Sequence, residues 1–312
     1  MDNLNTQHVI KSLEGNSVAT FSRSKLIKLI LNNTEIISEE ESESNYLLSG
    51  SYLCFPWVGR LTNDDKLKEL TKDSLPDYPF RDGNNLPLHG LYADAERIVL
   101  TSSDEGNSIS FIAECFQQFP FFIEEYKINQ YSLEIKTSFE NRNSETIQYF
   151  AYGYHPYIGI NRKNINKMSL NSNIKFNVEL TSQLVPDVCE NLQVMRKMLG
   201  DHEDNHLRKK IDDKKIDDLF FNPERSNIEN PFVDLIDHEE NLRVTVESDK
   251  SKSIRLNYFQ IYTPERRNCI AIEPLTSPSN AFNIDFPNKL IQLKPNESKE
   301  GLIKISLSKV TI

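Results

Sequence analysis

Alternation of apolar and polar residues with a period of two recurs along this chain and limits its possible folds more than any other feature. It is clearest over residues 131–139, YSLEIKTSF, where the first, third, fifth, seventh and ninth positions form one face. Successive side chains of a strand point to opposite faces, so this pattern predicts strands buried on one side. Shorter versions occur at 174–180, 242–246, 254–258 and 303–307.

Turn-forming stretches separate these predicted strands. ENRNS (140–144) and SDKSKS (248–253) are short enough to join neighbouring strands as hairpins. We therefore predict an all-β protein, a large antiparallel β-sandwich rather than a series of βαβ units. Because β-sandwiches often exceed about 200 residues in one domain, residues 1–312 are expected to form a single domain.

Two stretches interrupt the strand pattern. Residues 61–85 are polar and contain Pro76 and Pro79, which predicts a long loop. Loops of this length inside compact domains are usually functional. Residues 190–215 are the second interruption, where NLQVMRKML (191–199) is expected to form a short helix before a charged segment.

The composition excludes several classes of partner. Hydrophobic residues make up 38% of the chain and aromatic residues 10%, enough for a substantial core. The formal net charge of -10 opposes binding to nucleic acid or to an anionic membrane, and favours a neutral small molecule. The first residues lack the basic and apolar pattern of a secretory signal, and no apolar run is long enough to span a membrane. A cytoplasmic monomer or homodimer is expected.

The four cysteines are scattered singly along the chain, at Cys54, Cys115, Cys189 and Cys269. This spacing indicates neither a CxxC metal site nor a dense disulfide framework. We expect reduced thiols.

His155 is the first candidate functional residue. It lies in YFAYGYHPYIGI (149–160), an aromatic strand-forming run where a surface histidine would be unusual. Pro156 favours an extended backbone at His155, and Gly153 would leave space on the face that His155 and Tyr157 share. The alternative is a core histidine whose hydrogen bonds are satisfied, so the partners of His155 decide between the two.

His89 and Arg60 are candidates for binding a ligand. His89 follows the long loop in LPLHGLY (86–92), where its ring either points into a cleft or lies in solvent. Arg60 ends FPWVGR (55–60), and its guanidinium can donate several hydrogen bonds to ligand oxygens. Pairing with a neighbouring carboxylate is the commoner use of such an arginine.

Three carboxylates complete the set. Asp217 and Asp218 stand side by side in IDDLFF (216–221), so on a strand they point to opposite faces and one can face inward. The alternative is a turn with both in solvent. Glu273 follows the apolar run CIAI, where burial of a carboxylate requires hydrogen-bond partners or a raised pKa. It is the best candidate for a general base, against a solvent-exposed residue at a strand end.

The stretch HEDNH (202–206) matches the H-E-x-x-H zinc pattern, and Glu224 lies at a distance suitable for a third ligand. A zinc protease needs both histidines on one face of a helix that packs into the core. The surrounding sequence, DHEDNHLRKK, is almost uniformly polar. We therefore expect a solvated loop or charged helix here and no metal.

Five motifs in order, FPWVGRL, LPLHGLY, GYHPYIGI, IDDLFF and IAIEPLTSPSNAFN, resemble the aldose 1-epimerase (galactose mutarotase-like) family. The resemblance covers the chain from about Ser51 to Asn283. The family fold is a large antiparallel β-sandwich, in agreement with the strand pattern. The form GYHPY is similar to the less characterised branches of the family, so the identity of the sugar does not transfer.

The resemblance implies a role for each candidate residue. Glu273 would remove the proton of the anomeric hydroxyl, and His155 would protonate the ring oxygen. His89 and Arg60 would hold sugar oxygens, and Asp217 would accept hydrogen bonds from hydroxyls, with Asp218 as the alternative. The expected substrate is a monosaccharide, and no metal or organic cofactor is implied.

The same resemblance leaves two alternatives open. One is a hexose-6-phosphate 1-epimerase, although some relatives carry an arginine where this chain has Ala93. Its phosphate would have to be held by another arginine, for which the candidates are Arg60, Arg81 and Arg97. The other is a carbohydrate-binding protein without turnover. Trp57, Tyr154 and Tyr157 are the aromatic residues expected to cover the apolar face of a sugar ring.

Overall fold

The structure is a computed structural model that describes residues 6–23, 25–38, 46–71, 77–174, 176–186, 209–222, 229–284 and 290–310. The HEDNH motif, Glu224, Cys189 and the helix expected at 191–199 lie outside these ranges. Within them, no group of three or more His, Cys, Asp or Glu side chains could hold a metal ion. No helix in these ranges is both long enough and apolar enough to cross a membrane.

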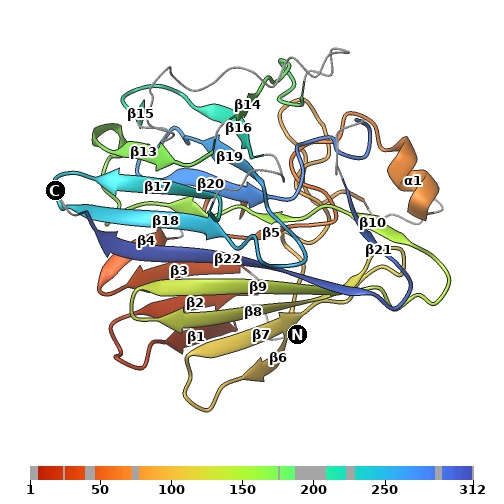
Figure 1. The fold of residues 1–312 in the computed structure, drawn as a ribbon, viewed down its shortest axis with the longest axis horizontal. Helices are drawn as coiled ribbons and strands as arrows, with labels where there is room; N and C mark the ends of the chain where they lie inside the picture. Colours follow the sequence, from red (N-terminus) through yellow and green to blue (C-terminus); the bar gives the residue numbers. More distant parts are fainter. Residues whose placement is uncertain are drawn as a thin grey trace.

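Antiparallel strands make up almost all of the described secondary structure, as predicted (Figure 1). The largest sheet has nine strands in the order β15-β13-β17-β18-β22-β9-β8-β7-β6. In chain order these are β6 (Ile98–Ser102), β7 (Ser108–Ile112), β8 (Phe121–Asn129), β9 (Ser132–Glu140), β13 (Ser169–Ser172), β15 (Lys209–Lys210), β17 (Phe232–Asp237), β18 (Leu242–Ser248) and β22 (Ser298–Lys309).

A seven-stranded sheet lies opposite and carries the candidate carboxylates Asp217, Asp218 and Glu273 on its strands. Its order is β14-β16-β19-β20-β11-β5, and β12 pairs with β20. The strands are β5 (Leu53–Cys54), β11 (Gly153–Tyr154), β12 (Tyr157–Ile158), β14 (Phe176–Val178), β16 (Asp217–Phe221), β19 (Tyr258–Tyr262) and β20 (Ile270–Leu275).

The remaining elements are shorter. β1 (Gln7–Lys11), β2 (Val18–Ser22), β3 (Lys25–Leu31) and β4 (Thr34–Ser38) form a four-stranded sheet, and β10 (Gln148–Phe150) pairs with β21 (Ile291–Leu293). A bridge between Leu26 and Ser51 joins the four-stranded sheet to the segment before β5. The helices are η1 (Tyr46–Leu48), α1 (Asp65–Thr71) and η2 (Ile165–Lys167).

Aromatic side chains fill the space between the two layers. Phe21 of β2 packs against Tyr126 of β8 with ring centroids 4.7 Å apart. The ring centroid of Phe55, directly after β5, lies 5.3 Å from that of Phe139 in β9 and 5.6 Å from that of Phe150 in β10. These contacts connect the four- and seven-stranded sheets to the nine-stranded sheet through one core.

Comparison with the predicted strands gives two corrections. In β9 the alternation is confirmed from Leu133 to Phe139, but Tyr131 is 48% exposed because it lies in the turn before this strand. The stretches 140–144 and 248–253 do not close hairpins, since each joins strands of different sheets. A turn signal shows where a strand ends but not which strand pairs with it.

The long loop predicted over residues 61–85 contains the helix α1. Asn63 caps its first turn by accepting the backbone N–H of Asp65 at 2.7 Å, and Leu67 is fully buried. Two buried side chains, those of Leu67 and Thr71, and a cap hold a helix too short to show a clear periodicity.

A buried ion pair crosses the core next to the strand that leads to His155. The Arg97 Nε and Glu124 Oε2 atoms lie 2.6 Å apart, and both side chains are 0% exposed. Glu124 also accepts hydrogen bonds from the hydroxyls of Tyr126 and Tyr154. Because these groups satisfy one another inside the core, removing either charge leaves the other one unpaired.

We expect Glu124→Gln to lower the free energy of unfolding by about 3 to 5 kcal/mol, since the Arg97 charge loses its partner in the core. The neighbouring Glu125→Gln is the matched control. Glu125 pairs with Lys136 at the surface, where such a pair contributes less than about 1 kcal/mol. Urea unfolding measures both variants, and equal destabilisation would contradict the role of the buried pair.

Candidate active site

The outer face of the seven-stranded sheet brings together two of the candidate carboxylates. In the strand register, Glu273 of β20 lies opposite Gln260 of β19, and Asp217 of β16 lies opposite Tyr262. Residues that lie opposite one another in adjacent strands share a face, and the face alternates along each strand. Glu273 and Asp217 therefore lie on the same face.

Asp218 lies on the other face of this sheet. It is opposite Ile261, which in turn lies opposite Ile272, and both isoleucines are buried in the core between the layers. The register therefore separates two adjacent aspartates that the sequence could not distinguish. Only Asp217 is directed to the face of Glu273.

His155 lies in the short break between β11 and β12, where backbone contacts hold it. Its N–H donates to the carbonyl of Tyr52 at 3.0 Å, and the Tyr157 N–H donates to the carbonyl of Gly50 at 2.9 Å. Gly153 allows β11 to approach β20 closely, since a Cβ atom there would lie 2.7 Å from the Pro274 carbonyl oxygen. The glycine thus serves the close approach of two strands, rather than leaving space beside His155 as the sequence suggested.

The side chains of His155 and Glu273 meet directly. The Nε2 atom of His155 lies 3.1 Å from the Oε1 atom of Glu273, and the two residues are 4% and 3% exposed. The Tyr52 ring stacks on the imidazole with centroids 4.9 Å apart, and the Tyr157 ring lies 4.8 Å away. An imidazole and a carboxyl thus form a hydrogen-bonded pair that aromatic rings largely shield from water.

Burial determines the protonation of this pair. Burial, which a backbone hydrogen bond opposes in part and the charges of Lys25 and Arg60 reinforce, lowers the pKa of His155 to about 3. Among the residues that the structure describes, the buried Nδ1 atom of His155 has no hydrogen-bond partner. Burial, and then the charge of Asp217, raise the pKa of Glu273 well above its usual range. Both shifts favour the uncharged forms, a neutral imidazole and a neutral carboxylic acid.

His89 lies against the same imidazole. Its ring centroid is 5.0 Å from that of His155, and the two rings are nearly perpendicular, at 88°. The backbone of His89 is in the left-handed region, with φ of 58°, and its N–H donates to the Gly59 carbonyl. Gly90 follows it in a space where a Cβ atom would lie 2.1 Å from the Phe55 oxygen. The close packing of Gly90 on Phe55 therefore holds His89 over the site.

Arg60 is close to the site but paired. Its Nε donates to the Asp82 carboxylate at 2.7 Å, the pairing that the sequence had offered as the alternative. The side chain is 21% exposed. Its charge lowers the pKa values of His155 and His89 and opposes the raised pKa of Glu273. Arg60 therefore acts on all three groups electrostatically while Asp82 fixes its orientation.

Asp217 has a partner that the sequence did not reveal. The Gln260 Nε2 donates to the Asp217 Oδ1 at 2.6 Å. Burial raises the pKa of Asp217, while Arg60 and the hydrogen bond from Gln260 lower it. Nothing in the local sequence marks Gln260, because only the register places it opposite Glu273.

Two of the three aromatic residues expected at the sugar lie elsewhere. Trp57 is fully buried, with its ring edge against Tyr78, and Tyr154 lies in the core with its hydroxyl on Glu124. Tyr157 does lie beside His155. Tyr52, which stacks on His155, was missed because a single tyrosine in a strand-rich sequence is indistinguishable from a core residue.

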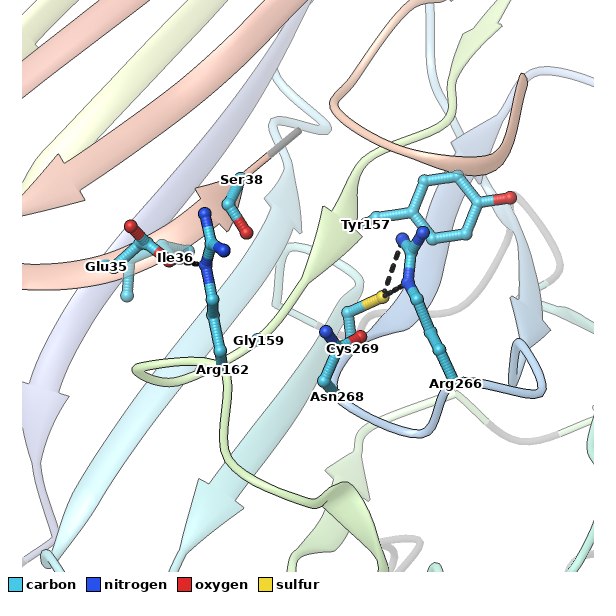
Figure 2. A pocket seen from close by; sticks show the side chains of 9 residues that line it. All are labelled: Glu35, Ile36, Ser38, Tyr157, Gly159, Arg162, Arg266, Asn268 and Cys269. Atoms are coloured by element: carbon cyan, nitrogen blue, oxygen red, sulfur yellow. Dashed lines mark hydrogen bonds and ion pairs between the residues drawn. The ribbon is translucent and has the colours of Figure 1, made fainter. Parts of the chain in front are cut away.

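Tyr157 also borders a small hollow that Arg266, Asn268 and Cys269 line with it (Figure 2). Arg266 points toward this ring there, with its guanidinium carbon 5.3 Å from the ring centroid. Two of the guanidinium nitrogens of Arg266 donate to the Cys269 sulfur, at 3.2 and 3.0 Å. These contacts hold the Arg266 guanidinium beside the ring of Tyr157.

The sequence model of the aldose 1-epimerase family matches residues 24–306, most of the chain. The chain belongs to the aldose 1-epimerase family. No match was found among curated protein sequences. The predicted resemblance and fold class are thus confirmed for this family member. Among the described cysteines, Cys54, Cys115 and Cys269 are not in disulfides.

Solved structures of similar fold agree with membership of the aldose 1-epimerase family. The GalM/aldose epimerase homologue from C. elegans has a TM-score of 0.71 at 14% identity, covering 98% of this chain and 100% of that chain. A galactose mutarotase-like protein from Clostridium acetobutylicum has a TM-score of 0.69 at 17% identity, with 98% and 99% covered. Galactose 1-epimerase from Lactobacillus acidophilus NCFM has a TM-score of 0.63 at 14% identity, with 98% and 100% covered. At these identities the likeness concerns the fold.

The lowered pKa of His155 predicts how stability depends on pH. Between pH 7 and pH 5 the unfolded chain takes up a proton on His155, near its ordinary pKa of about 6.5. The folded protein does not take it up, because the folded pKa is about 3. Stability contributed by neutral His155 is therefore complete above the unfolded pKa and is lost as the pH falls toward the folded value.

His155→Gln removes this proton uptake. From pH 7 to pH 5, its free energy of unfolding should fall by about 2 kcal/mol less than that of the unaltered protein. Urea unfolding at several pH values measures the difference. Parallel pH profiles for the two proteins would show that His155 is not held neutral.

Proposed function

We propose that this protein is a cofactor-independent aldose 1-epimerase, an isomerase that interconverts the α and β anomers of a free aldose. The observation that carries the proposal is the 3.1 Å contact between His155 and Glu273 on the outer face of the seven-stranded sheet. The anomeric hydroxyl oxygen and the ring oxygen of an aldose are bonded to the same carbon. Two groups at hydrogen-bond distance from each other can therefore reach both oxygens together.

The proposed reaction begins from the neutral pair. A proton passes from the Glu273 carboxyl to the His155 Nε2, which gives a carboxylate and an imidazolium without changing the total charge. Glu273 then removes the proton of the anomeric hydroxyl while His155 protonates the ring oxygen, and the bond between the ring oxygen and the anomeric carbon breaks. After rotation of the aldehyde, closure on its other face reverses both proton transfers and yields the other anomer.

The environment of the pair suits this chemistry. Burial lowers the pKa of His155 and raises that of Glu273, which favours the neutral pair at rest, so the charged pair forms only in the course of the reaction. His89 and Asp217 are proposed to hold sugar hydroxyls, and Arg60 to hold a further oxygen and favour the Glu273 carboxylate. Tyr157 offers a ring face beside the imidazole.

The contacts that the candidate arginines make within the protein favour a free aldose as substrate over a hexose 6-phosphate. Arg97 is fully buried against Glu124, and Arg60 pairs with Asp82. Arg81 donates to the Asn85 carbonyl oxygen at 2.7 Å. Arg97 is thus buried away from any ligand, while the bonds that Arg60 and Arg81 make to protein oxygens leave only part of each guanidinium for one.

Polarimetry on freshly dissolved α-anomers tests the reaction. The protein should accelerate the approach to anomeric equilibrium, and Glu273→Gln should lower kcat/KM by at least about 100-fold because the general base is lost. Glu134→Gln, which alters a half-buried glutamate on the nine-stranded sheet, is the control and should leave the rate unchanged.

Two results would overturn the proposal. Sugar binding in calorimetry that persists in His155→Ala, without any anomer exchange by the unaltered protein, would indicate a binding protein. A clear preference for aldose 6-phosphates over free aldoses would indicate the phosphate-specific enzyme.

The two adjacent aspartates provide a test of the substrate contacts. Asp217→Asn should raise KM by about tenfold or more, since a hydrogen bond from a sugar hydroxyl to a charged group is weakened. Asp218→Asn is the matched control and should leave KM within about twofold, because its side chain is on the opposite face. Initial-rate polarimetry gives both constants, and equal effects would contradict the assignment of Asp217.

A further inference from the structure

A cysteine lies against one ring nitrogen of His89. The Sγ atom of Cys54, the last residue of β5, is 3.4 Å from the His89 Nδ1 atom, and the two residues are 0% and 9% exposed. In the part of the chain that the structure describes, no protein group bonds to the Nε2 atom of His89. This second nitrogen is therefore open to a ligand.

The chemistry of the two groups decides which atom donates. Burial, together with the charges of His155 and Arg60, lowers the pKa of His89 well below its usual value, so the ring is neutral and carries one N–H. Burial and the charge of Glu273 raise the pKa of Cys54, so its sulfur keeps its proton. An imidazole nitrogen is a better acceptor than a thiol sulfur. The S–H thus donates to Nδ1, and the ring proton resides on Nε2.

We propose that Cys54 is a positioning residue that holds His89 in the tautomer with its proton on Nε2, so that His89 presents a hydrogen-bond donor to a sugar oxygen. The proposal rests on the function proposed above. It adds Cys54 to the site and specifies that His89 donates the hydrogen bond to the sugar oxygen. A ring oxygen or a carbonyl oxygen accepts hydrogen bonds but cannot donate them. In the other tautomer, the Nε2 lone pair would face such an oxygen and repel it.

The surroundings leave His89 little freedom to compensate. Its ring also contacts the edge of Tyr52, with centroids 5.9 Å apart, and it is perpendicular to His155. Gly90 fixes the following backbone against Phe55. A lost hydrogen bond at Nδ1 should therefore change the tautomer rather than the position of the ring.

The tautomer can be observed without substrate. Proteins labelled with ¹⁵N-histidine are compared by two-bond ¹H–¹⁵N spectra, which distinguish Nδ1–H from Nε2–H, with the His89 signals assigned from His89→Gln. The unaltered protein and Cys54→Ser, whose hydroxyl can still donate, should show the Nε2–H form. Cys54→Ala should show a mixture of both forms, and Cys115→Ala, which alters a cysteine outside the site, should match the unaltered protein.

Kinetics provide the second measurement. Cys54→Ala should raise KM about five- to tenfold relative to Cys54→Ser, the loss of one neutral hydrogen bond, with a smaller change in kcat. An Nδ1–H signal in the unaltered protein would overturn the proposal, as would an unchanged tautomer in Cys54→Ala. Equal KM values in the serine and alanine variants would do the same. Should the unaltered protein turn over no aldose, the proposed function fails, while the ¹⁵N spectra still decide the role of Cys54.

Discussion

The contact between His155 and Glu273 depends on the close approach of two short strands. β11 and β20 pair through Gly153 and Leu275, at a point where any side chain on the glycine would collide with the backbone of β20. This approach brings an imidazole and a carboxyl, 118 positions apart in the sequence, to 3.1 Å. Two ionisable groups that would each be costly to bury alone are stable there because each satisfies the other.

The sandwich provides what this pair requires from its surroundings. One face of the seven-stranded sheet packs its isoleucines and phenylalanines into the aromatic core. The opposite face carries Glu273, Asp217 and Gln260 in fixed register, beside a smaller apolar cluster that includes Leu219, Tyr258 and Leu275. Alternation along each strand thus separates the candidate site from the main core.

Low polarity around the pair determines where its proton resides. Burial shifts the pKa of His155 down and that of Glu273 up, so the neutral form of the pair is favoured over the charged form. The proposed catalysis, and the tautomer assigned to His89, both depend on this exclusion of water.

The sequence by itself determined the all-β class, most of the inward face of β9, and the five candidate residues, because strand periodicity and short motifs are local properties. Only the tertiary structure decided which of those residues meet. Strand register distinguished Asp217 from Asp218 and identified Gln260, while a contact between segments 35 residues apart placed Cys54 on His89. The tertiary structure also placed Trp57 and Tyr154 in the core. It showed that the turns expected to close hairpins join strands of different sheets. These features follow from pairing between distant segments, which a local pattern does not encode.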